Sequence, residues 1–213
     1  MKKEETSSYN ELVEKTGLTE METAKWKEVQ EKIYLPRKEG TKLLEQFEGY
    51  FELDNVTIEK YDENDWPIRP EALKTKKAKE TQINKQADVV MLLHLMGNEF
   101  DDETIKENYA YYEKRTLHGS SLSPSIYSVM GLKVGDDSKA YRYLRRAAFI
   151  DLLNMQGNTR EGIHAANTGG VWQTIVFGFA GVSQREDGKL RVCPNMPEEW
   201  QNLTFRLHYK GAW

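Results

Sequence analysis

The chain has 213 residues, of which 38% are hydrophobic and 30% charged, and this is enough for one globular core or for one domain with part of a second. The 30 basic and 34 acidic side chains leave a formal net charge of −4, and no long basic run is present, so a nucleic-acid partner is not expected. The single cysteine, Cys193, excludes an intramolecular disulfide and a multi-cysteine metal cluster.

The sequence predicts neither a signal peptide nor a membrane span. Its first residues, MKKEETSSYNE, are charged and lack an apolar core, and no stretch reaches the roughly 20 apolar residues that a membrane helix needs. A lone cysteine is typical of a reducing compartment, and Cys193 is expected to be a buried or half-buried apolar residue. We therefore expect a soluble, cytoplasmic protein.

The first predicted helix covers residues 19–33. Met21, Trp26 and Val29 follow a loosely helical period, and Thr19 stands at the amino end as a candidate cap. Residues 35–70 contain several prolines and glycines and no sustained period, which predicts long connecting loops.

Two helices of different character follow. Residues 82–96 are apolar on nearly every side after Asp88, which predicts a helix that is buried all round. Residues 101–115 begin with acids and end with Lys114 and Arg115, an arrangement that the helix dipole favours in a surface helix.

The same alternation then repeats. A buried helix is predicted after Ser123, with Pro124 in its first turn, and Asp136 starts a half-exposed helix. The glycine-rich residues 161–170 lead into another short apolar helix. The apolar face expected on the half-exposed helix consists of Ala140, Leu144, Ala147, Ala148 and Leu152.

Alternating buried and half-exposed helices, with polar residues before each buried one, are typical of a double-layered helical barrel whose inner helices begin at a common rim. Two runs with strand-like alternation follow, at residues 189–194 and 203–211. Two strands are too few for an independent sheet, so we interpret them as the start of a β domain. The predicted domains are a partial barrel over residues 1–184 and a truncated β domain over residues 185–213.

Three polar motifs each precede a buried helix. They are NKQADV (84–89), TLHGSSLSPS (116–125) and GIHAANTGGVWQ (162–173). The free backbone amides at helix starts attract anions, so the three motifs together predict one polar site.

Five side chains in these motifs suit a sugar and a phosphate. Lys85 supplies a cation and Gln86 an amide that can donate to and accept from sugar hydroxyls. Ser120, Ser121 and His164 supply donors for a phosphate. No metal-ligating cluster is expected among them.

These motifs, in this order, with QFEGYF upstream and LRVCPNMPEEW downstream, resemble glycoside hydrolase family 65, which contains the inverting phosphorylases of maltose, kojibiose, nigerose and trehalose. The resemblance runs from about residue 46 to residue 211. It implies a mainly α fold, the second half of an (α/α)6 barrel followed by the first strands of a β-sandwich. It also implies glucose binding at Lys85 and Gln86, and phosphate binding at Ser120, Ser121 and His164.

The mechanism that the resemblance implies needs one carboxylic acid and no cofactor. The acid protonates the glycosidic oxygen of an α-glucosyl disaccharide while inorganic phosphate, the co-substrate, attacks the anomeric carbon from the opposite face. In the family this acid lies upstream of the first motif, in a histidine- and asparagine-rich segment that this chain lacks. No catalytic residue is therefore expected here, and the general acid is expected upstream.

Half of a barrel would leave inner helices uncovered. An exposed apolar seam is therefore expected, together with homo-oligomerisation or association with the missing half-barrel. Two other functions stay open: a non-catalytic sugar- or phosphate-binding remnant, and a hydrolase of the same family, which would need a base besides the acid.

Several single residues have two interpretations. Gly119 stands where many maltose-type members carry an acid and Tyr127 where a histidine is common, which leaves the disaccharide open. His164 taken alone could be a helix cap. Tyr141 and Trp172 are expected in the core rather than as sugar platforms.

Overall fold

The computed structural model describes residues 2–64, 66–185 and 187–212, with side chains from residue 8 onward. It divides into two compact units, Met1–Leu35 and Pro36–Trp213. None of the described helices is both long and apolar enough to cross a lipid bilayer.

The first unit consists of helices α1 (Lys2–Thr16) and α2 (Glu20–Lys32). The predicted cap of α2 is confirmed, because the Thr19 hydroxyl accepts from the backbone N–H of Glu22 at 3.2 Å and the Glu22 carboxylate accepts from the backbone N–H of Thr19 at 3.0 Å. This reciprocal capping box satisfies two amides that the helix leaves free. Within this unit α2 has no buried residue, and α1 is a helix that the sequence pattern did not predict.

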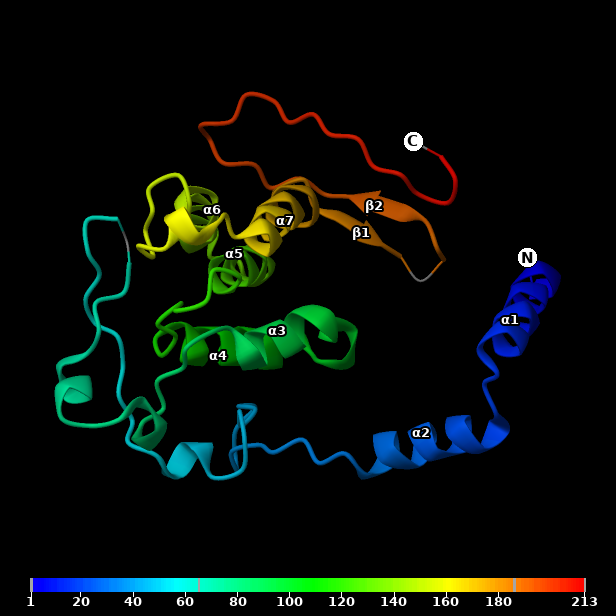
Figure 1. The fold of residues 1–213 in the computed structure, drawn as a ribbon, viewed down its shortest axis with the longest axis horizontal. Helices are drawn as coiled ribbons and strands as arrows, with labels where there is room; N and C mark the ends of the chain where they lie inside the picture. The colour runs from blue at the N-terminus through cyan, green and yellow to red at the C-terminus, as the bar shows by residue number, and fades with distance from the viewer. Residues whose placement is uncertain (1, 65, 186, 213) are drawn as a thin grey trace. The chain divides into compact units, whose positions relative to one another are not determined.

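The second unit is a double layer of helices (Figure 1). Helix α5 packs between α3 and α7, helix α4 contacts both α3 and α5, and helix α6 contacts both α5 and α7. The inner layer is thus α3, α5 and α7, and the outer layer is α4 and α6, as the alternating sequence pattern predicts. The bounds are α3 (Asp88–Leu95), α4 (Asp102–Glu113), α5 (Ser123–Val134), α6 (Asp137–Phe149) and α7 (Ala165–Gln173), which continues as the π-helix η6 (Thr174–Phe179).

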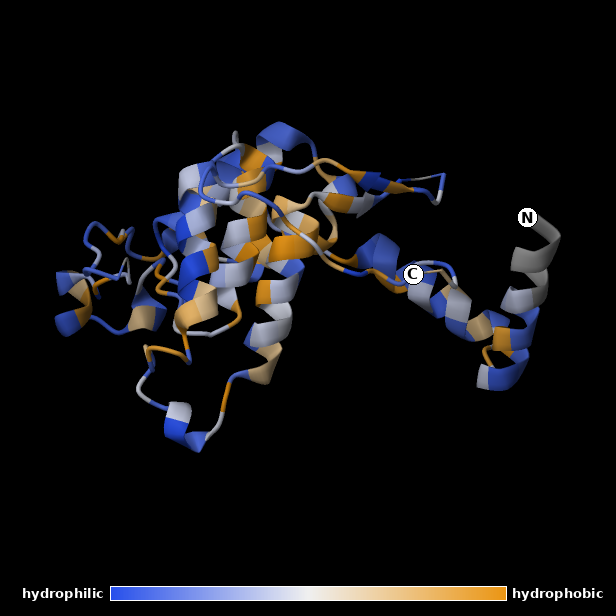
Figure 2. Cartoon of the chain, turned by 90° about the horizontal axis from the view of Figure 1, so that it is seen from above, coloured by the Kyte–Doolittle hydropathy of each residue, from blue (hydrophilic) through white to orange (hydrophobic). Residues whose placement is uncertain are grey.

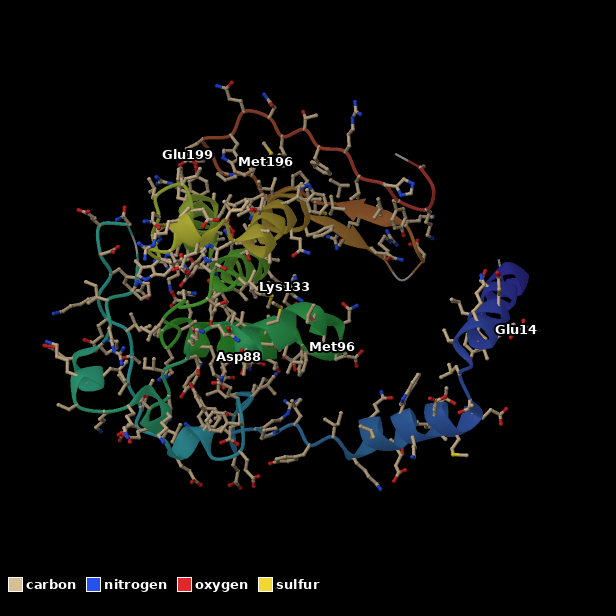
Figure 3. All side chains as sticks on the ribbon, in the orientation of Figure 1. Glu14, Asp88, Met96, Lys133, Met196 and Glu199 are labelled. Carbon is tan, nitrogen blue, oxygen red and sulfur yellow. The ribbon has the colours of Figure 1, made fainter. Side chains whose placement is uncertain are left out.

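Inner helices α3 and α5 run in the same direction. Asp88 lies at one end of α3, and Met96 and Lys133 lie together at the other (Figure 3). The Lys133 ammonium comes within 2.5 Å of the position that a Cβ on Gly97 would take. The amino ends of α3 and α5 therefore share one rim.

Local capping explains where the outer helices begin. The Asp101 carboxylate accepts from the backbone N–H of Thr104 at 2.7 Å, and the Asp136 carboxylate accepts from the backbone N–H of Lys139 at 3.3 Å. Pro124 occupies the first turn of α5, where its missing N–H costs nothing. These three helix starts agree with the sequence prediction.

The largest core lies between α3, α4 and α5. Figure 2 shows that hydrophobic residues, coloured orange, are concentrated on helices in the middle of this unit. It is rich in tyrosine, and most of the rings meet edge to face or tilted, as aromatic quadrupoles favour. Its fully buried large side chains include Leu44, Tyr50, Leu93, Tyr112 and Tyr127.

Asn108 of α4 fastens the irregular segment around residue 43 to this core. Its side chain is fully buried; Oδ1 accepts from the backbone N–H of Leu44 at 2.8 Å, and Nδ2 donates to the carbonyls of Lys42 and Thr104 at 2.9 and 2.8 Å. The long loops predicted for residues 35–70 are confirmed apart from a short 3-10 turn, Tyr50–Glu52. Side-chain bonds such as these hold them in place.

Three expectations for the helices are wrong in detail. Helix α3 begins at Asp88 rather than near residue 82, and it is not buried all round, since Leu95 is 70% exposed. Helix α6 ends at Phe149, so Leu152 falls beyond its apolar face and is 77% exposed. Ala148 is exposed as well. Large apolar side chains exposed on the inner helices agree with the predicted apolar seam.

Two further core assignments need correction. Trp172 is 43% exposed, whereas Tyr141 packs against Phe179 and Trp200 as expected. Cys193 is exposed rather than buried, because the segment after β2 lies along the surface of the unit.

The carboxyl-terminal part contains one antiparallel pair, β1 (Val182–Gln184) and β2 (Leu190–Val192), with Val182 opposite Val192. The predicted strand at 189–194 is thus confirmed, but its partner is β1 and not residues 203–211. The alternation in that second run has another cause. Leu203, Phe205 and Leu207 pack against a cluster of η6 and β1, consisting of Val176, Ala180 and Val182.

Candidate anion and sugar site

The backbone joins the first two polar motifs at the shared rim. The N–H of Gly119 donates to the carbonyl of Lys85 at 2.8 Å, and the N–H of Leu117 donates to the carbonyl of Asn84 at 2.8 Å. Both motifs lead directly into inner helices, α3 and α5, so their polar residues meet at the two amino ends. The structure thus brings the first two of the three predicted motifs together.

A hollow of about 260 Å³ lies where the two motifs meet, and Gln86, Asp88 and Ser120 line it. The Gln86 amide nitrogen donates to Asp88 Oδ1 at 3.1 Å, while Gln46 donates to Asp88 Oδ2 at 2.7 Å. Asp88 therefore orients the Gln86 amide. The amide oxygen of Gln86 stays able to accept from a sugar hydroxyl.

Lys85 carries the positive charge of the first motif. Its side chain is exposed, and no salt bridge forms on it within the described residues. A Cβ at Gly119 would lie 3.3 Å from Lys85 Cγ, so any larger residue there must displace the Lys85 stem. Gly119 thus gives the lysine its space, and an acid at this position would also lower the positive potential.

His164 of the third motif stands just before α7 and pairs with a carboxylate. Its ring Nδ1 lies 2.6 Å from Asp151 Oδ1, and its backbone N–H donates to Asp151 Oδ2 at 2.7 Å. The ring and backbone hydrogen bonds from His164 hold the pKa of Asp151 below its usual range. His164 is therefore anchored by a carboxylate that stays ionised, and it does not cap the helix through its ring.

The other ring nitrogen of His164 remains available for an anion. Asn158 Nδ2 lies 3.5 Å from His164 Nε2, at the outer limit of a hydrogen bond. Because the Nδ1 proton is directed at Asp151, a protonated ring would present Nε2–H as a charge-assisted donor. Asp151 orients that donor.

The third motif is connected to the second through helix packing. The hydroxyl of Thr174 donates to the carbonyl of Ser125 at 3.2 Å, and Gly170 approaches Ser125 so closely that a Cβ would lie 2.6 Å from its hydroxyl. Gly170 therefore lets α7 pack closely against the first turn of α5. The described hydrogen bonds join the first two motifs directly and the third only by way of α5.

The roles of two further serines follow from their partners. The Ser125 hydroxyl donates to the carbonyl of Leu122 at 2.9 Å, so it belongs to the helix start. The Ser123 hydroxyl lies 2.8 Å from Nδ1 of the buried His118. Ser120 and Ser121 are half-exposed, which leaves them as the serine candidates for an anion.

Sequence reasoning missed Asp151. It precedes His164 by 13 residues and lies just past the end of α6, within a run that reads as the apolar end of that helix. No local motif marks such a partner. Only the packing of α6 against α7 brings the two side chains together.

We expect Asp151→Asn to weaken the binding of inorganic phosphate by about tenfold, because a hydrogen bond to a charged group contributes about 1.5–3 kcal/mol and the amide holds the His164 ring in place less firmly than the carboxylate does. A phosphate titration followed by NMR of the labelled chain measures this. Asp187→Asn, in the turn before β2, is the matched control. Equal phosphate affinities for the two variants would contradict a role for Asp151.

Comparison with known proteins relates the helical double layer and its β extension to two domain models of one family. The model of the glycosyl hydrolase family 65 central catalytic domain matches residues 1–173, and that of the family 65 C-terminal domain matches residues 184–213. The chain belongs to glycosyl hydrolase family 65.

The similar proteins are phosphorylases by name. A kojibiose phosphorylase of Thermoanaerobacter brockii is 50% identical over 211 residues, which cover 99% of this chain and 27% of that protein. An alpha,alpha-trehalose phosphorylase of the same organism is 34% identical over 99% of this chain and 27% of its own length. A solved structure, a putative kojibiose phosphorylase from human microbiome, is 32% identical with a TM-score of 0.76, covering 95% of this chain and 27% of that one.

Proposed function

We propose that this chain forms the phosphate- and glucose-binding part of an inverting disaccharide phosphorylase that uses no cofactor. The chain spans about a quarter of the length of the curated relatives it matches, 27% in the first case. The proposed reaction is attack of inorganic phosphate on the glucosyl anomeric carbon, which releases glucose 1-phosphate. The general acid belongs to a part of the site outside this chain.

The observation that carries this proposal is the rim itself. Two inner helices begin side by side, Gln86 and Ser120 line the hollow between them, and the backbone of Lys85 accepts the hydrogen bond that joins the two motifs. Helix amino ends and serine hydroxyls suit a phosphate, whereas Lys85 and the oriented Gln86 amide suit sugar hydroxyls. His164, fixed by Asp151, adds a further donor at the start of α7.

The proposed disaccharide is kojibiose. This chain is 50% identical to a kojibiose phosphorylase and 34% identical to a trehalose phosphorylase from the same organism, over the same share of its length. Gly119, in place of an acid, leaves the Lys85 side chain its space and its positive charge without a neighbouring carboxylate at residue 119. The exposed apolar side chains of α3 and α7, among them Leu95 and Trp172, are proposed contacts for further parts of the barrel or for a second copy.

A chimera tests the function. The matching 211 residues of the Thermoanaerobacter brockii kojibiose phosphorylase are exchanged for this chain, and phosphate-dependent release of glucose 1-phosphate is measured on kojibiose, nigerose, trehalose and maltose. We expect activity on kojibiose, and a loss of about 100-fold or more in His164→Ala, because a preorganised donor of this kind contributes that much to turnover.

Lys106→Ala is the control for that variant, since Lys106 is exposed on the outer helix α4 and lies outside the three motifs. A folded chimera that releases no glucose 1-phosphate from any of the four sugars would contradict the enzymatic function and favour a non-catalytic binding remnant. Release of glucose without phosphate would favour a hydrolase.

A further inference from the structure

A fully buried histidine lies at the start of the second motif. His118 is 1% exposed, its ring packs against those of Tyr127 and Tyr143 with centroids 4.9 Å away in each case, and its backbone has a φ of 52°. A left-handed backbone conformation is uncommon outside glycine and costs free energy. The side chain of His118 must therefore have contacts that hold this conformation, directly before Gly119 and Ser120.

Those contacts form a continuous chain of hydrogen bonds. His118 Nδ1 lies 2.8 Å from the Ser123 hydroxyl and Nε2 lies 3.2 Å from the Tyr143 hydroxyl. The Tyr143 hydroxyl donates to Glu113 Oε1 at 3.0 Å, and Glu113 Oε2 pairs with the Lys139 ammonium at 2.9 Å. The chain thus runs from the first turn of α5, through α6, to a carboxylate at the end of α4.

The carboxylate sets the direction of every bond in this chain. Glu113 is buried and paired with Lys139, so it only accepts, and the Tyr143 proton must point to it. Tyr143 can then only accept from His118, which places the ring proton on Nε2. Burial, reinforced by the positive charge of Arg146, lowers the pKa of His118 well below its ordinary value, so the ring carries this one proton.

Since the neutral ring has its proton on Nε2, its Nδ1 must accept, and the Ser123 hydroxyl must donate to it. The Ser123 proton is therefore directed into the protein and cannot be given to a ligand. Ser123 is further held by its backbone N–H, which donates to the carbonyl of Ser120 at 3.1 Å.

We infer that His118 is a positioning residue for the proposed anion site, held by a one-directional hydrogen-bond chain from Ser123 through His118 and Tyr143 to Glu113. These hydrogen bonds hold the Gly119–Ser121 loop against Lys85. They leave the Ser120 and Ser121 hydroxyls able to donate to an anion, whereas the Ser123 hydroxyl is not. The functional consequence rests on the proposed phosphate binding, whereas the direction of the bonds does not.

The position of the ring proton on His118 tests the direction of these hydrogen bonds. The chain has 4 histidines, so long-range nitrogen-proton NMR spectra of the histidine-labelled chain contain few ring signals, and a His118→Asn variant assigns one of them. At neutral pH we expect His118 as the neutral tautomer with its proton on Nε2. A charged ring, or a proton on Nδ1, overturns the inference.

Tyr143→Phe tests the coupling to the loop. Without the tyrosine hydroxyl, Nε2–H has lost its acceptor, so we expect the ring proton to move to Nδ1, the Ser123 hydroxyl to reverse, and the amide signals of Gly119 and Ser120 to shift. Tyr141→Phe, on the same helix but packed against Phe179 and Trp200, is the matched control. Unchanged ring and loop signals in Tyr143→Phe overturn the inference.

If Tyr143→Phe does not fold, Glu113→Gln replaces it. The amide oxygen of the glutamine is expected to take the side facing the Lys139 ammonium, so that its NH2 donates to the Tyr143 hydroxyl, Tyr143 donates to His118 Nε2, and the ring proton moves to Nδ1. A single unchanged tautomer in Glu113→Gln again overturns the inference.

A titration with inorganic phosphate separates this inference from the proposed function. We expect phosphate to shift the Ser120 and Ser121 amides of the unaltered chain, and Tyr143→Phe to weaken binding by about tenfold while Tyr141→Phe does not. No binding by the unaltered chain, with the Nε2–H tautomer present, would contradict the proposed function alone. Equal binding by both variants would contradict the positioning role.

Discussion

Asn108→Ala is expected to lower the free energy of unfolding of the second unit by about 3 kcal/mol, because it leaves a buried backbone N–H and carbonyl groups without partners. The Asn108 side chain makes all three of its hydrogen bonds inside the protein, two of them to the segment at Lys42 and Leu44. Leu44 is itself fully buried, so no solvent replaces the lost bonds. Urea unfolding at constant pH measures the change.

Asn202→Ala is the control for that substitution, since Asn202 is exposed in the carboxyl-terminal segment. We expect its effect to stay within about 0.5 kcal/mol, as for other surface substitutions. Similar losses in the two variants would show that Asn108 does not fasten residues 42–44 to α4.

Acid is expected to destabilise the fold through His118. The pKa of His118 is well below the ordinary 6.5 in the folded chain, mainly because the ring is buried. As the pH falls below 6.5, the unfolded chain binds a proton that the folded chain does not, so the free energy of unfolding decreases, by about 1.4 kcal/mol per pH unit at most for one such group. Above that pH the contribution is constant.

The groups around His118 do not reverse this sign. Tyr127 and Tyr143 stay neutral, since burial raises the pKa of each well above 10.0, and Arg146 stays charged. Asp101, with its pKa lowered to about 2, and Asp151 lose their charges only at lower pH. Between pH 6.5 and about 4.5, the pH dependence of the free energy of unfolding therefore reports on buried histidines.

Denaturant unfolding at a series of pH values measures the effect. We expect His118→Asn to remove most of the pH dependence in this window, since asparagine also tolerates the left-handed backbone. His94→Asn is the comparison: burial and Lys133 also lower the pKa of His94, but the ring is only half-buried, so its removal should change the slope less. An identical slope in His118→Asn and the unaltered chain would contradict a neutral His118.

Local chemistry explains which structural features the sequence predicts correctly. Thr19, Asp101 and Asp136 cap helices through bonds that span three residues, and Pro124 marks a helix start by itself. Such signals lie wholly within a short stretch of chain. The sequence does not predict helix α1, because this segment is mostly polar and has no periodic pattern of apolar residues.

Sequence patterns whose structural role depends on residues far away in the chain predict the structure less well. The alternation of Leu203, Phe205 and Leu207 is genuine, but it faces a helix and a short strand rather than a sheet partner. Exposure of Cys193 and Trp172 likewise depends on which elements pack nearby, and composition carries no information about that.

For the site, the sequence by itself determined the three polar motifs, their order and the family they resemble, because each motif is a continuous string at a helix start. Only the tertiary structure decided that Gly119 meets Lys85, that Asp151 anchors His164, and that Glu113 directs the bonds of His118. The physical reason is that these partners come from different helices. A buried hydrogen bond between helices leaves no pattern in either sequence segment alone.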